Sequence, residues 1–452
     1  RANEVLTNLV QGGLMTEGEV IDARRHPATA VDRSTKEAPD FFLDWAYEQT
    51  LDVARKRDFS DHTLIVRTTL DTGLQYAAET AVETGLRQYG ETYRVKQGAM
   101  VVIENGGAVR AMVGGRDYGE SQFNRATRAL RQPGSSFKVY TYALAMENGF
   151  TPESTIVDAP ISWGNWSPQN YERSYEGRVT LMTGLAKSIN TIPVRLAKEH
   201  FGIPAIIKMA HDMGVETPIK NDVTIPIGTS EVTIMDQATA YGVFMSGGMQ
   251  TRRHGITQIT DDSGKIIYDF NRDEPPARRV LTEQAATSMN RILVTIPVNG
   301  TARRAALDNA IPTAGKTGTT QSYRDAWFVG FTGNFTCAVW LGNDDFSPTN
   351  RITGGSLPAA TFKKLMDYAH EGIPLRAIPG IDVPTPAIIA SNVSAEKKAG
   401  TEETRLSIER PRMLSPASTR LIESIGKALA NASPLSGAAA DGIPQPVQVG
   451  SN

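Results

Sequence analysis

The strongest chemical signal in the sequence is a serine followed three residues later by a lysine, Ser135 and Lys138. The turn signal Pro133-Gly134 precedes the pair, and no glycine or proline follows until Gly149. We therefore predict a turn that feeds a helix, with both side chains on one face. A serine hydroxyl needs a base beside it to become a nucleophile, and a lysine serves if burial or a nearby cation lowers its pKa. Alone, the same spacing also suits a solvated helix start.

Two further motifs follow in order, Ser188-Ile189-Asn190 and then the run Lys316-Thr317-Gly318-Thr319-Thr320. The first lies within a helical pattern over 180–198 and is predicted to form a turn between helices. The second reads as a strand in which Gly318 lets the backbone approach a ligand closely. Taken singly, Ser188 and Asn190 could cap a helix and Lys316 could be a surface residue. All three motifs in this order favour one active site.

The elements that must position these residues form an α+β pattern. Strand-like segments at 99–103 and 108–113 flank the turn signal Asn105-Gly106-Gly107, and a second hairpin pairs 326–331 with 336–341. With the strand at 313–320 and the helices between, this predicts a five-stranded antiparallel sheet between helical layers. We also expect a strand at 63–69, helices at 72–88, 235–245, 283–298 and 359–371, an aromatic helix at 40–47, and alternating helix and loop over 199–310. The aromatic loop at 150–178 is predicted to wall or cover the site.

Composition restricts the class of protein. The chain has 452 residues, 40% hydrophobic and 21% charged, with a net charge of −2, so we expect no nucleic-acid surface. It contains no apolar run long enough for a membrane span. The only cysteine, Cys337, is predicted to be a buried apolar residue rather than a nucleophile. The six histidines are scattered, so we expect no metal site and no cofactor.

The three motifs and their surroundings resemble class A penicillin-binding proteins of the 1A type. The likeness extends to 97–100, 114–118, 131–135 and 228–233, and it covers most of residues 1–372. The resemblance implies the penicillin-binding and β-lactamase-like fold. It also implies a D,D-transpeptidase that cross-links the stem peptides of peptidoglycan and is acylated by β-lactams.

The resemblance also implies roles for the motif residues. Ser135 would attack the bond between two D-alanines, Lys138 would be its base, Ser188 would relay a proton, and Asn190 would hold Lys138 and the substrate amide. Lys316 would help to keep Lys138 neutral. The substrate would be held by Thr317, Gly318, Thr319 and Thr320, and the backbone N–H groups of Ser135 and Thr319 would form the oxyanion hole.

The chain divides into four expected regions. By the resemblance, residues 1–27 would be the tail of a glycosyltransferase domain whose body lies upstream, with 28–96 a linker region and 97–373 the transpeptidase domain. The resemblance does not explain residues 374–452, whose richness in proline, alanine and serine predicts a linker and tail that is partly disordered, with one helix near 418–429. A membrane helix upstream would anchor the protein on the outer face of the cytoplasmic membrane. Expected partners are stem peptides or their lipid-linked precursor, β-lactams and cell-wall assembly proteins.

Three alternatives remain open at this point. A D,D-carboxypeptidase would form the same acyl-enzyme and pass it to water. A non-catalytic β-lactam sensor or scaffold would keep the fold alone. A serine β-lactamase shares the motifs, but the sequence shows no local equivalent of the glutamate-bearing loop that class A lactamases use.

Overall fold

The computed structural model describes residues 39–57 and 63–382, with the isolated positions Val10, Gly12, Thr16 and Val20. Apart from those four positions, the glycosyltransferase tail expected at 1–27 lies outside the described residues, as does the chain beyond 382 with the helix expected near 418–429. Within the described ranges, no helix is both long and apolar enough to cross a lipid bilayer.

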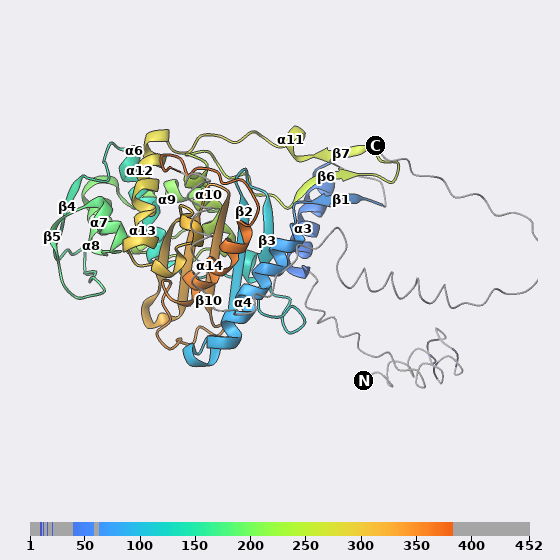
Figure 1. Cartoon of the computed structure of the whole chain (residues 1–452), viewed down its shortest axis with the longest axis horizontal. Helices are drawn as coiled ribbons and strands as arrows, with labels where there is room; N and C mark the ends of the chain where they lie inside the picture. The colour runs from blue at the N-terminus through green and yellow to red at the C-terminus, as the bar shows by residue number, and fades with distance from the viewer. Residues whose placement is uncertain are drawn as a thin grey trace, which may run out of the picture. The chain divides into compact units, whose positions relative to one another are not determined.

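A five-stranded antiparallel sheet lies at the centre of the fold, in the order β3-β2-β10-β9-β8 (Figure 1). Its strands are β2 (Gln97–Glu104), β3 (Val109–Val113), β8 (Ala314–Thr319), β9 (Asp325–Phe331) and β10 (Phe335–Gly342). Both predicted hairpins are confirmed, because β2 pairs with β3 and β9 pairs with β10. β10 also pairs with β2, with Cys337 opposite Val102, and this contact joins the two hairpins. β8 is left as an edge strand.

Helices cover both faces of this sheet, which confirms the predicted fold class. On one face lie α4 (Thr72–Tyr93) and α14 (Leu357–Ala369), which also contact each other. On the other face lies α10 (Ile234–Met245), against β2, β9 and β10. Two further helices, α6 (Lys138–Glu147) and α12 (Glu283–Leu293), contact each other, and α12 contacts α10. α6 therefore begins beside the sheet, and its first residue is a predicted site residue.

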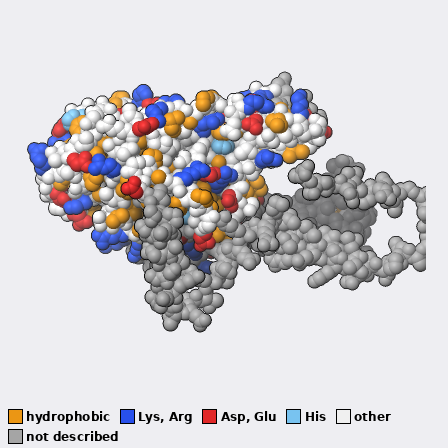
Figure 2. Space-filling view, turned by 45° about the horizontal axis from the view of Figure 1, so that its top comes forward, with side chains coloured by type: hydrophobic (Ala, Val, Ile, Leu, Met, Phe, Trp, Pro, Cys, Tyr) orange, Lys and Arg blue, Asp and Glu red, His pale blue; other side chains and the backbone are white. Residues whose placement is uncertain are grey.

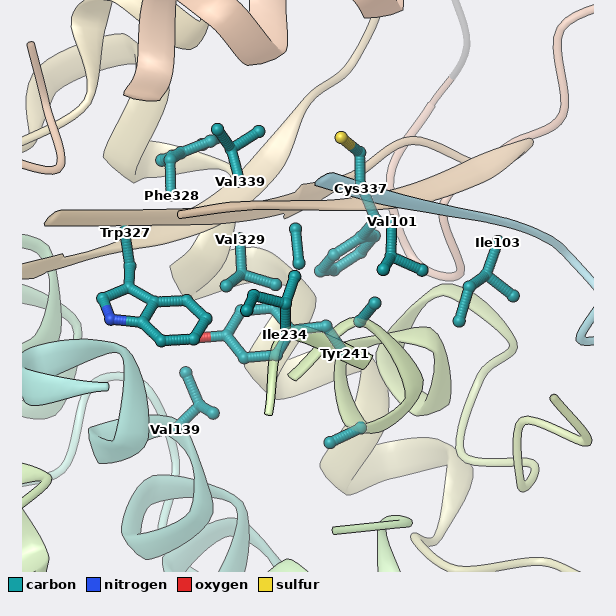
Figure 3. Packing of buried hydrophobic residues seen from close by; sticks show 14 of the residues in the cluster. Val101, Ile103, Val139, Ile234, Tyr241, Trp327, Phe328, Val329, Cys337 and Val339 are labelled. Atoms are coloured by element: carbon teal, nitrogen blue, oxygen red, sulfur yellow. The ribbon is translucent and has the colours of Figure 1, made fainter. Parts of the chain in front are cut away.

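Side chains alternate between the two faces of the sheet, as the strand period requires. Figure 3 shows Trp327 and Val329 on the side of Tyr241 from α10, with Phe328 on the opposite side. The Phe328 ring meets Phe362 of α14 edge-on, with 4.7 Å between ring centroids. Cys337 is fully buried, as predicted, and burial raises the pKa of its thiol. The thiol is therefore a packing group.

The segment before the sheet folds against it. Asp71 caps α4, because its carboxylate accepts a hydrogen bond from the Leu74 N–H at 2.9 Å. The predicted start of this helix is confirmed, and its end lies five residues beyond the predicted Gln88. The predicted aromatic helix is α3 (Asp40–Arg57), which buries Phe41 and Phe42.

The structure contains a second, three-stranded sheet that was not predicted from the sequence. It contains β1 (Ile65–Thr68), β6 (Ile256–Thr260) and β7 (Ile266–Asp269), in the order β1-β6-β7. The prediction that 199–310 holds only helix and loop is wrong here. The two strands are short and half-buried, so they carry little alternation, and pairing with the distant β1 stabilises them.

The remaining elements surround the two ends of the main sheet. The predicted helix over 283–298 is divided into α12 and α13 (Thr295–Asn299). Figure 2 shows basic and acidic side chains interspersed on one face of the molecule. The other short elements are α5 (Arg125–Arg128), η1 (Gly134–Phe137), β4 (Thr155–Asp158), β5 (Gly177–Thr180), α7 (Leu181–Ala186), α8 (Thr191–Leu196), η2 (Ala197–Phe201), α9 (Ile203–Asp212), η3 (Ile225–Ile227), α11 (Phe270–Asp273), η4 (Arg303–Ala305), η5 (Asp308–Ala310) and η6 (Gln321–Tyr323).

Candidate active site

The predicted nucleophile and base lie on consecutive turns. Ser135 belongs to η1, a single tight turn, and Lys138 is the first residue of α6. The backbone N–H of Lys138 donates to the Ser135 carbonyl, so the two turns are continuous. Ser135 is half-buried and Lys138 is fully buried. The sequence predicted this turn-to-helix transition, and the structure adds that the turn is a 3-10 helix.

Close backbone contacts from two other segments hold this turn. The N–H of Gly134 donates to the carbonyl of Gly228 at 3.1 Å. A Cβ on Gly228 would lie 1.9 Å from the Gly134 oxygen, and the residue has φ +82°, so only glycine fits. A Cβ on Gly318 of β8 would lie 2.2 Å from the Pro133 oxygen. The turn therefore packs between β8 and the segment that precedes α10.

Buried polar groups of α10 support the turn from behind, and the sequence analysis did not single them out. The Gln237 amide donates to the Ser136 hydroxyl at 3.1 Å, and the Tyr241 hydroxyl donates to the Ser136 carbonyl at 2.7 Å. Tyr140 donates to Gln237 at 2.8 Å. A glutamine in a largely apolar helix is the sequence signal that could have identified this support.

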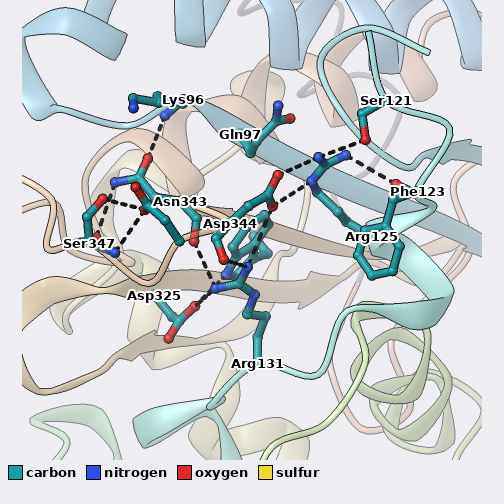
Figure 4. Close-up of polar contacts among 12 residues, drawn as sticks. Lys96, Gln97, Ser121, Phe123, Arg125, Arg131, Asp325, Asn343, Asp344 and Ser347 are labelled. Atoms are coloured by element: carbon teal, nitrogen blue, oxygen red, sulfur yellow. Dashed lines mark hydrogen bonds and ion pairs between the residues drawn. The ribbon is translucent and has the colours of Figure 1, made fainter. Parts of the chain in front are cut away.

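Arg131 anchors the chain before the nucleophile, in a network shown in Figure 4. It is 4% exposed, and its guanidinium lies 3.7 Å from the Asp325 carboxylate and 3.6 Å from that of Asp344. The same group lies over the rings of Trp340 and Phe346, at 4.8 and 4.3 Å from their centroids. It donates to the Asn343 carbonyl at 2.9 Å. Arg131 therefore ties the nucleophile turn to the ends of β9 and β10.

The three sequence motifs meet around the amine of Lys138. Its Nζ lies 2.7 Å from the Ser188 carbonyl, 2.6 Å from Asn190 Oδ1 and 3.3 Å from the Ser188 hydroxyl. The Ser188 hydroxyl also accepts from Lys316 Nζ at 2.9 Å. One hydroxyl therefore lies between two buried amines. The backbone of Ser188 has φ +58°, a strained conformation that aims its side chain and carbonyl at the same point.

The electrostatics of the lysine pair favour neutral amines. Burial, and to a lesser degree the neighbouring Lys316, holds the pKa of Lys138 well below its usual range. Burial lowers the pKa of Lys316 to about 7. Among the described residues, no carboxylate forms an ion pair with either amine. Two uncompensated ammonium groups in this interior would be costly, so burial and the mutual repulsion of the two amines favour the neutral form of Lys138.

Asn190 is fixed by the loop that links β4 to β5. Its Nδ2 donates to the Gln169 carbonyl at 2.7 Å, and its backbone N–H donates to Asn170 Oδ1 at 3.0 Å. The Asn170 amide in turn donates to the buried Asp158 carboxylate at 2.8 Å. These contacts leave Asn190 Oδ1 directed at Lys138.

The Lys-Thr-Gly run forms β8, the edge of the sheet beside the nucleophile turn. The Thr317 hydroxyl lies 2.7 Å from that of Thr301, and the Thr319 hydroxyl accepts from the Gly354 N–H at 3.1 Å. Thr320 differs from the two, because its hydroxyl accepts from the Asp325 N–H at 2.9 Å inside the turn to β9. The structure thus brings the nucleophile, both lysines, Ser188, Asn190 and the Thr317–Thr319 strand together. Thr320 completes the following turn.

Comparison with known proteins places this arrangement in a family. The family model of the penicillin-binding protein transpeptidase domain matches residues 97–367. The chain is similar to penicillin-binding protein 1A of Aquifex aeolicus, at 38% identity over 58% of this chain and 36% of that protein. It is also similar to penicillin-binding protein 1A of Neisseria flavescens, at 34% identity over 65% of this chain and 39% of that protein. The chain therefore spans less than half the length of these relatives.

Solved structures show the same fold. The penicillin-binding protein PonA1 from Mycobacterium tuberculosis matches 76% of this chain and 96% of its own, with a TM-score of 0.67 and 26% identity. A second structure of PonA1, in complex with penicillin V, matches 77% of this chain and 99% of its own at 25% identity, also with a TM-score of 0.67.

Proposed function

Because the chain belongs to the penicillin-binding protein transpeptidase family, we propose that it is a serine D,D-transpeptidase that cross-links the stem peptides of peptidoglycan. The observation that carries this proposal is the buried amine of Lys138, one turn from Ser135. Its lowered pKa and its carbonyl partners make it a base suited to activating a serine.

In the acylation step, Lys138 removes the proton from the Ser135 hydroxyl as the oxygen attacks the carbonyl between two D-alanines. A neutral amine has two N–H bonds and one lone pair. Asn190 Oδ1 and the Ser188 carbonyl accept the two N–H bonds, so the lone pair is free to take the proton. Collapse of the tetrahedral intermediate breaks the C–N bond. Ser188, which lies between the two lysines, passes its proton to the leaving amine of the last D-alanine and regains one from the ammonium of Lys138.

In the transfer step, an amine of a second stem peptide attacks the ester on Ser135. Its proton passes back to Lys138, and the Ser135 oxygen is reprotonated as it leaves. The backbone N–H groups of Ser135 and Thr319 would stabilise the oxyanion in both steps. One such donor typically contributes about 2.7–4 kcal/mol to lowering the barrier.

The substrate would lie along the free edge of β8. Thr317 and Thr319 would bind its terminal carboxylate through their hydroxyls, and Gly318 and Thr320 would shape that edge. Asn190 would hold the substrate amide. No metal or cofactor takes part in this mechanism.

A D,D-carboxypeptidase and a non-catalytic β-lactam sensor are the alternative functions, since both keep this fold. The relatives are named penicillin-binding protein 1A and are much longer than this chain. We propose that residues 1–27 are the tail of an upstream glycosyltransferase domain, 28–96 a linker region whose helices α3 and α4 pack on the transpeptidase domain, 97–373 the transpeptidase domain itself and 374–452 a tail. We place the protein on the outer face of the cytoplasmic membrane, anchored by an upstream helix, with cell-wall assembly proteins as partners.

Mass spectrometry of the intact protein after incubation with benzylpenicillin tests the proposal. We expect a stable adduct of one penicillin on the wild type and none on the S135A variant, whose thermal unfolding should match the wild type. Rapid loss of the drug without an adduct would indicate a β-lactamase. An intact drug without an adduct would leave only the scaffold function. Turnover of a D-Ala-D-Ala peptide with and without an acceptor amine then separates transfer from hydrolysis.

A further inference from the structure

Two tyrosines and an arginine converge beside the candidate active site without a role in the proposed mechanism. The hydroxyls of Tyr171 and Tyr323 lie 3.0 Å apart, although 152 positions separate them in the chain. Tyr171 follows Gln169 and Asn170, which hold Asn190, and Tyr323 lies in η6 directly after β8. The Arg351 guanidinium hydrogen-bonds Tyr323 as well. The cluster therefore lies between the Asn190 loop and the end of the β8 edge.

The backbone of this cluster is strained. Ser322, Tyr323 and Arg351 all have positive φ, at 61°, 54° and 59°, a conformation that costs energy for residues other than glycine. Surrounding contacts hold them there: the hydroxyl and the N–H of Thr349 both donate to the Tyr323 carbonyl. Ile352, next to Arg351, is fully buried. The loops are therefore fixed in a shape that presents exposed polar groups.

The cluster lies where a bound peptide would continue. A peptide added antiparallel to β8, with its terminal carboxylate at Thr317 and Thr319, runs past Thr319 toward Tyr323 as it is traced back from its C-terminus. At about 3.3 Å per residue, the residues before the D-alanines reach the end of this strand. Side chains that precede the scissile bond would therefore meet the tyrosine pair and Arg351.

The charges in and around the cluster indicate which chemical group it would bind. Arg351 is exposed, and no carboxylate of the described chain forms an ion pair with it. Glu172 is the acidic neighbour of Tyr171, and its charge acts on that tyrosine. Hydrogen bonds from Tyr171 and then from Arg351 lower the pKa of Tyr323, whereas the same contact between the two tyrosines raises the pKa of Tyr171. Two hydroxyls and a guanidinium suit a carboxylate.

We propose that Tyr171, Tyr323 and Arg351 form a subsite that binds a side-chain carboxylate of the donor stem peptide, upstream of its two D-alanines. The subsite makes the enzyme prefer donors with an acidic residue over donors in which that group is an amide. This inference rests on the proposed transpeptidase function.

Competition against penicillin tests the subsite. Two synthetic peptides end in D-Ala-D-Ala and differ only in glutamate or glutamine as the third residue from the C-terminus. Each is added during acylation of the full chain by a fluorescent penicillin, and the ratio of their inhibition constants is measured. We expect the wild type to favour the acidic peptide about two- to fivefold, the range of an exposed ion pair. The preference should shrink at high salt.

The R351A variant should bring the ratio close to one, and Y323F should lower it partly. R351K should retain part of the preference, because lysine keeps the positive charge but lacks the paired N–H donors of the guanidinium. R87A removes an exposed arginine from α4, and we expect it to keep the wild-type ratio. The ratio is taken within each variant, so a general loss of activity cancels.

Two results would overturn the inference alone. One is a wild type that is acylated by penicillin but does not distinguish the two peptides. The other is an R351A variant that keeps the wild-type ratio. A wild type that forms no penicillin adduct would overturn the proposed function, and this inference with it.

Discussion

At the scale of the residue, the site depends on two lysines held close together, with no ion-pair partner for either among the residues that the structure describes. Lys138 and Lys316 both reach the Ser188 hydroxyl, and burial is the largest cause of the lowered pKa of each. The charge of Lys316 is a further cause for Lys138 alone. Because the two groups interact, they titrate as a pair rather than singly. In the proposed mechanism, Lys138 is the member of the pair that acts as the base for Ser135.

Replacing Lys316 with methionine should shift the pH dependence of penicillin acylation. Acylation needs neutral Lys138, so its rate falls as the pH drops through the pKa of that amine. Without the nearby cation this pKa rises, so the acid limb should move to higher pH. Second-order acylation rates measured from pH 5 to 10 would show the shift.

The K316R variant keeps a cation and should leave the limb closer to its wild-type position. An acid limb that stays in place in K316M would show that the charge of Lys316 does not act on Lys138. The readout is the pH at which the acylation rate falls, because the maximal rate also reflects lost substrate contacts.

At the scale of the element, the nucleophile turn is held by its neighbours rather than by its own helix. η1 contacts β8 through Gly318, the segment before α10 through Gly228, and α10 itself through Ser136. Arg131 ties the preceding residues to Asp325 and Asp344. The position of Ser135 therefore depends on contacts between segments far apart in the chain.

Substituting Gly228 with alanine should displace this turn. The positive φ alone costs about 1–2 kcal/mol, and the clash with Gly134 adds about 1–3 kcal/mol. Gly149 offers a matched control, since it has φ +84° and a Cβ added there would meet no heavy atom within 4 Å. Chemical denaturation and penicillin acylation measured on both variants separate the two effects.

We expect G149A to lose stability only through its backbone and to keep its acylation rate. G228A should lose more stability and should be acylated much more slowly. Equal losses in the two variants would contradict the role that we assign to the close contact.

At the scale of the whole molecule, residues before the family match are part of the folded unit. The match begins at residue 97, yet α4 packs on the main sheet and β1 pairs with β6. The face of α4 that meets the sheet is apolar, and it buries Leu74, Ala77, Ala78, Ala81, Val82 and Leu86. Losing these contacts would expose to water the part of this face, over β2 and β3, that α4 covers.

A chain that begins at residue 97 should therefore fail to fold, whereas one that spans 39–382 should fold and be acylated. Solubility, the midpoint of thermal unfolding and penicillin labelling of the two truncated proteins test this prediction. A soluble, cooperatively unfolding protein from residue 97 onward would show that α3, β1 and α4 are dispensable.

The sequence alone predicted the chemistry that we propose, and it determined most of the local structure. Turn residues and strand alternation predicted both hairpins and the buried Cys337, and a capping residue predicted the start of α4. These signals act over a few positions of the chain. Motif order indicated that Ser135, Lys138, Ser188, Asn190 and Lys316 share one site.

Only the tertiary structure decided how those residues meet. The β1-β6-β7 sheet, the support of Ser136 by Gln237, the anchoring of Arg131 and the Tyr171–Tyr323 contact all join segments far apart in the chain. Such contacts leave no periodic pattern in the sequence, because each depends on which buried surfaces face one another after folding. The lowered pKa of Lys138 has the same origin, since burial and the approach of Lys316 exist only in the folded chain.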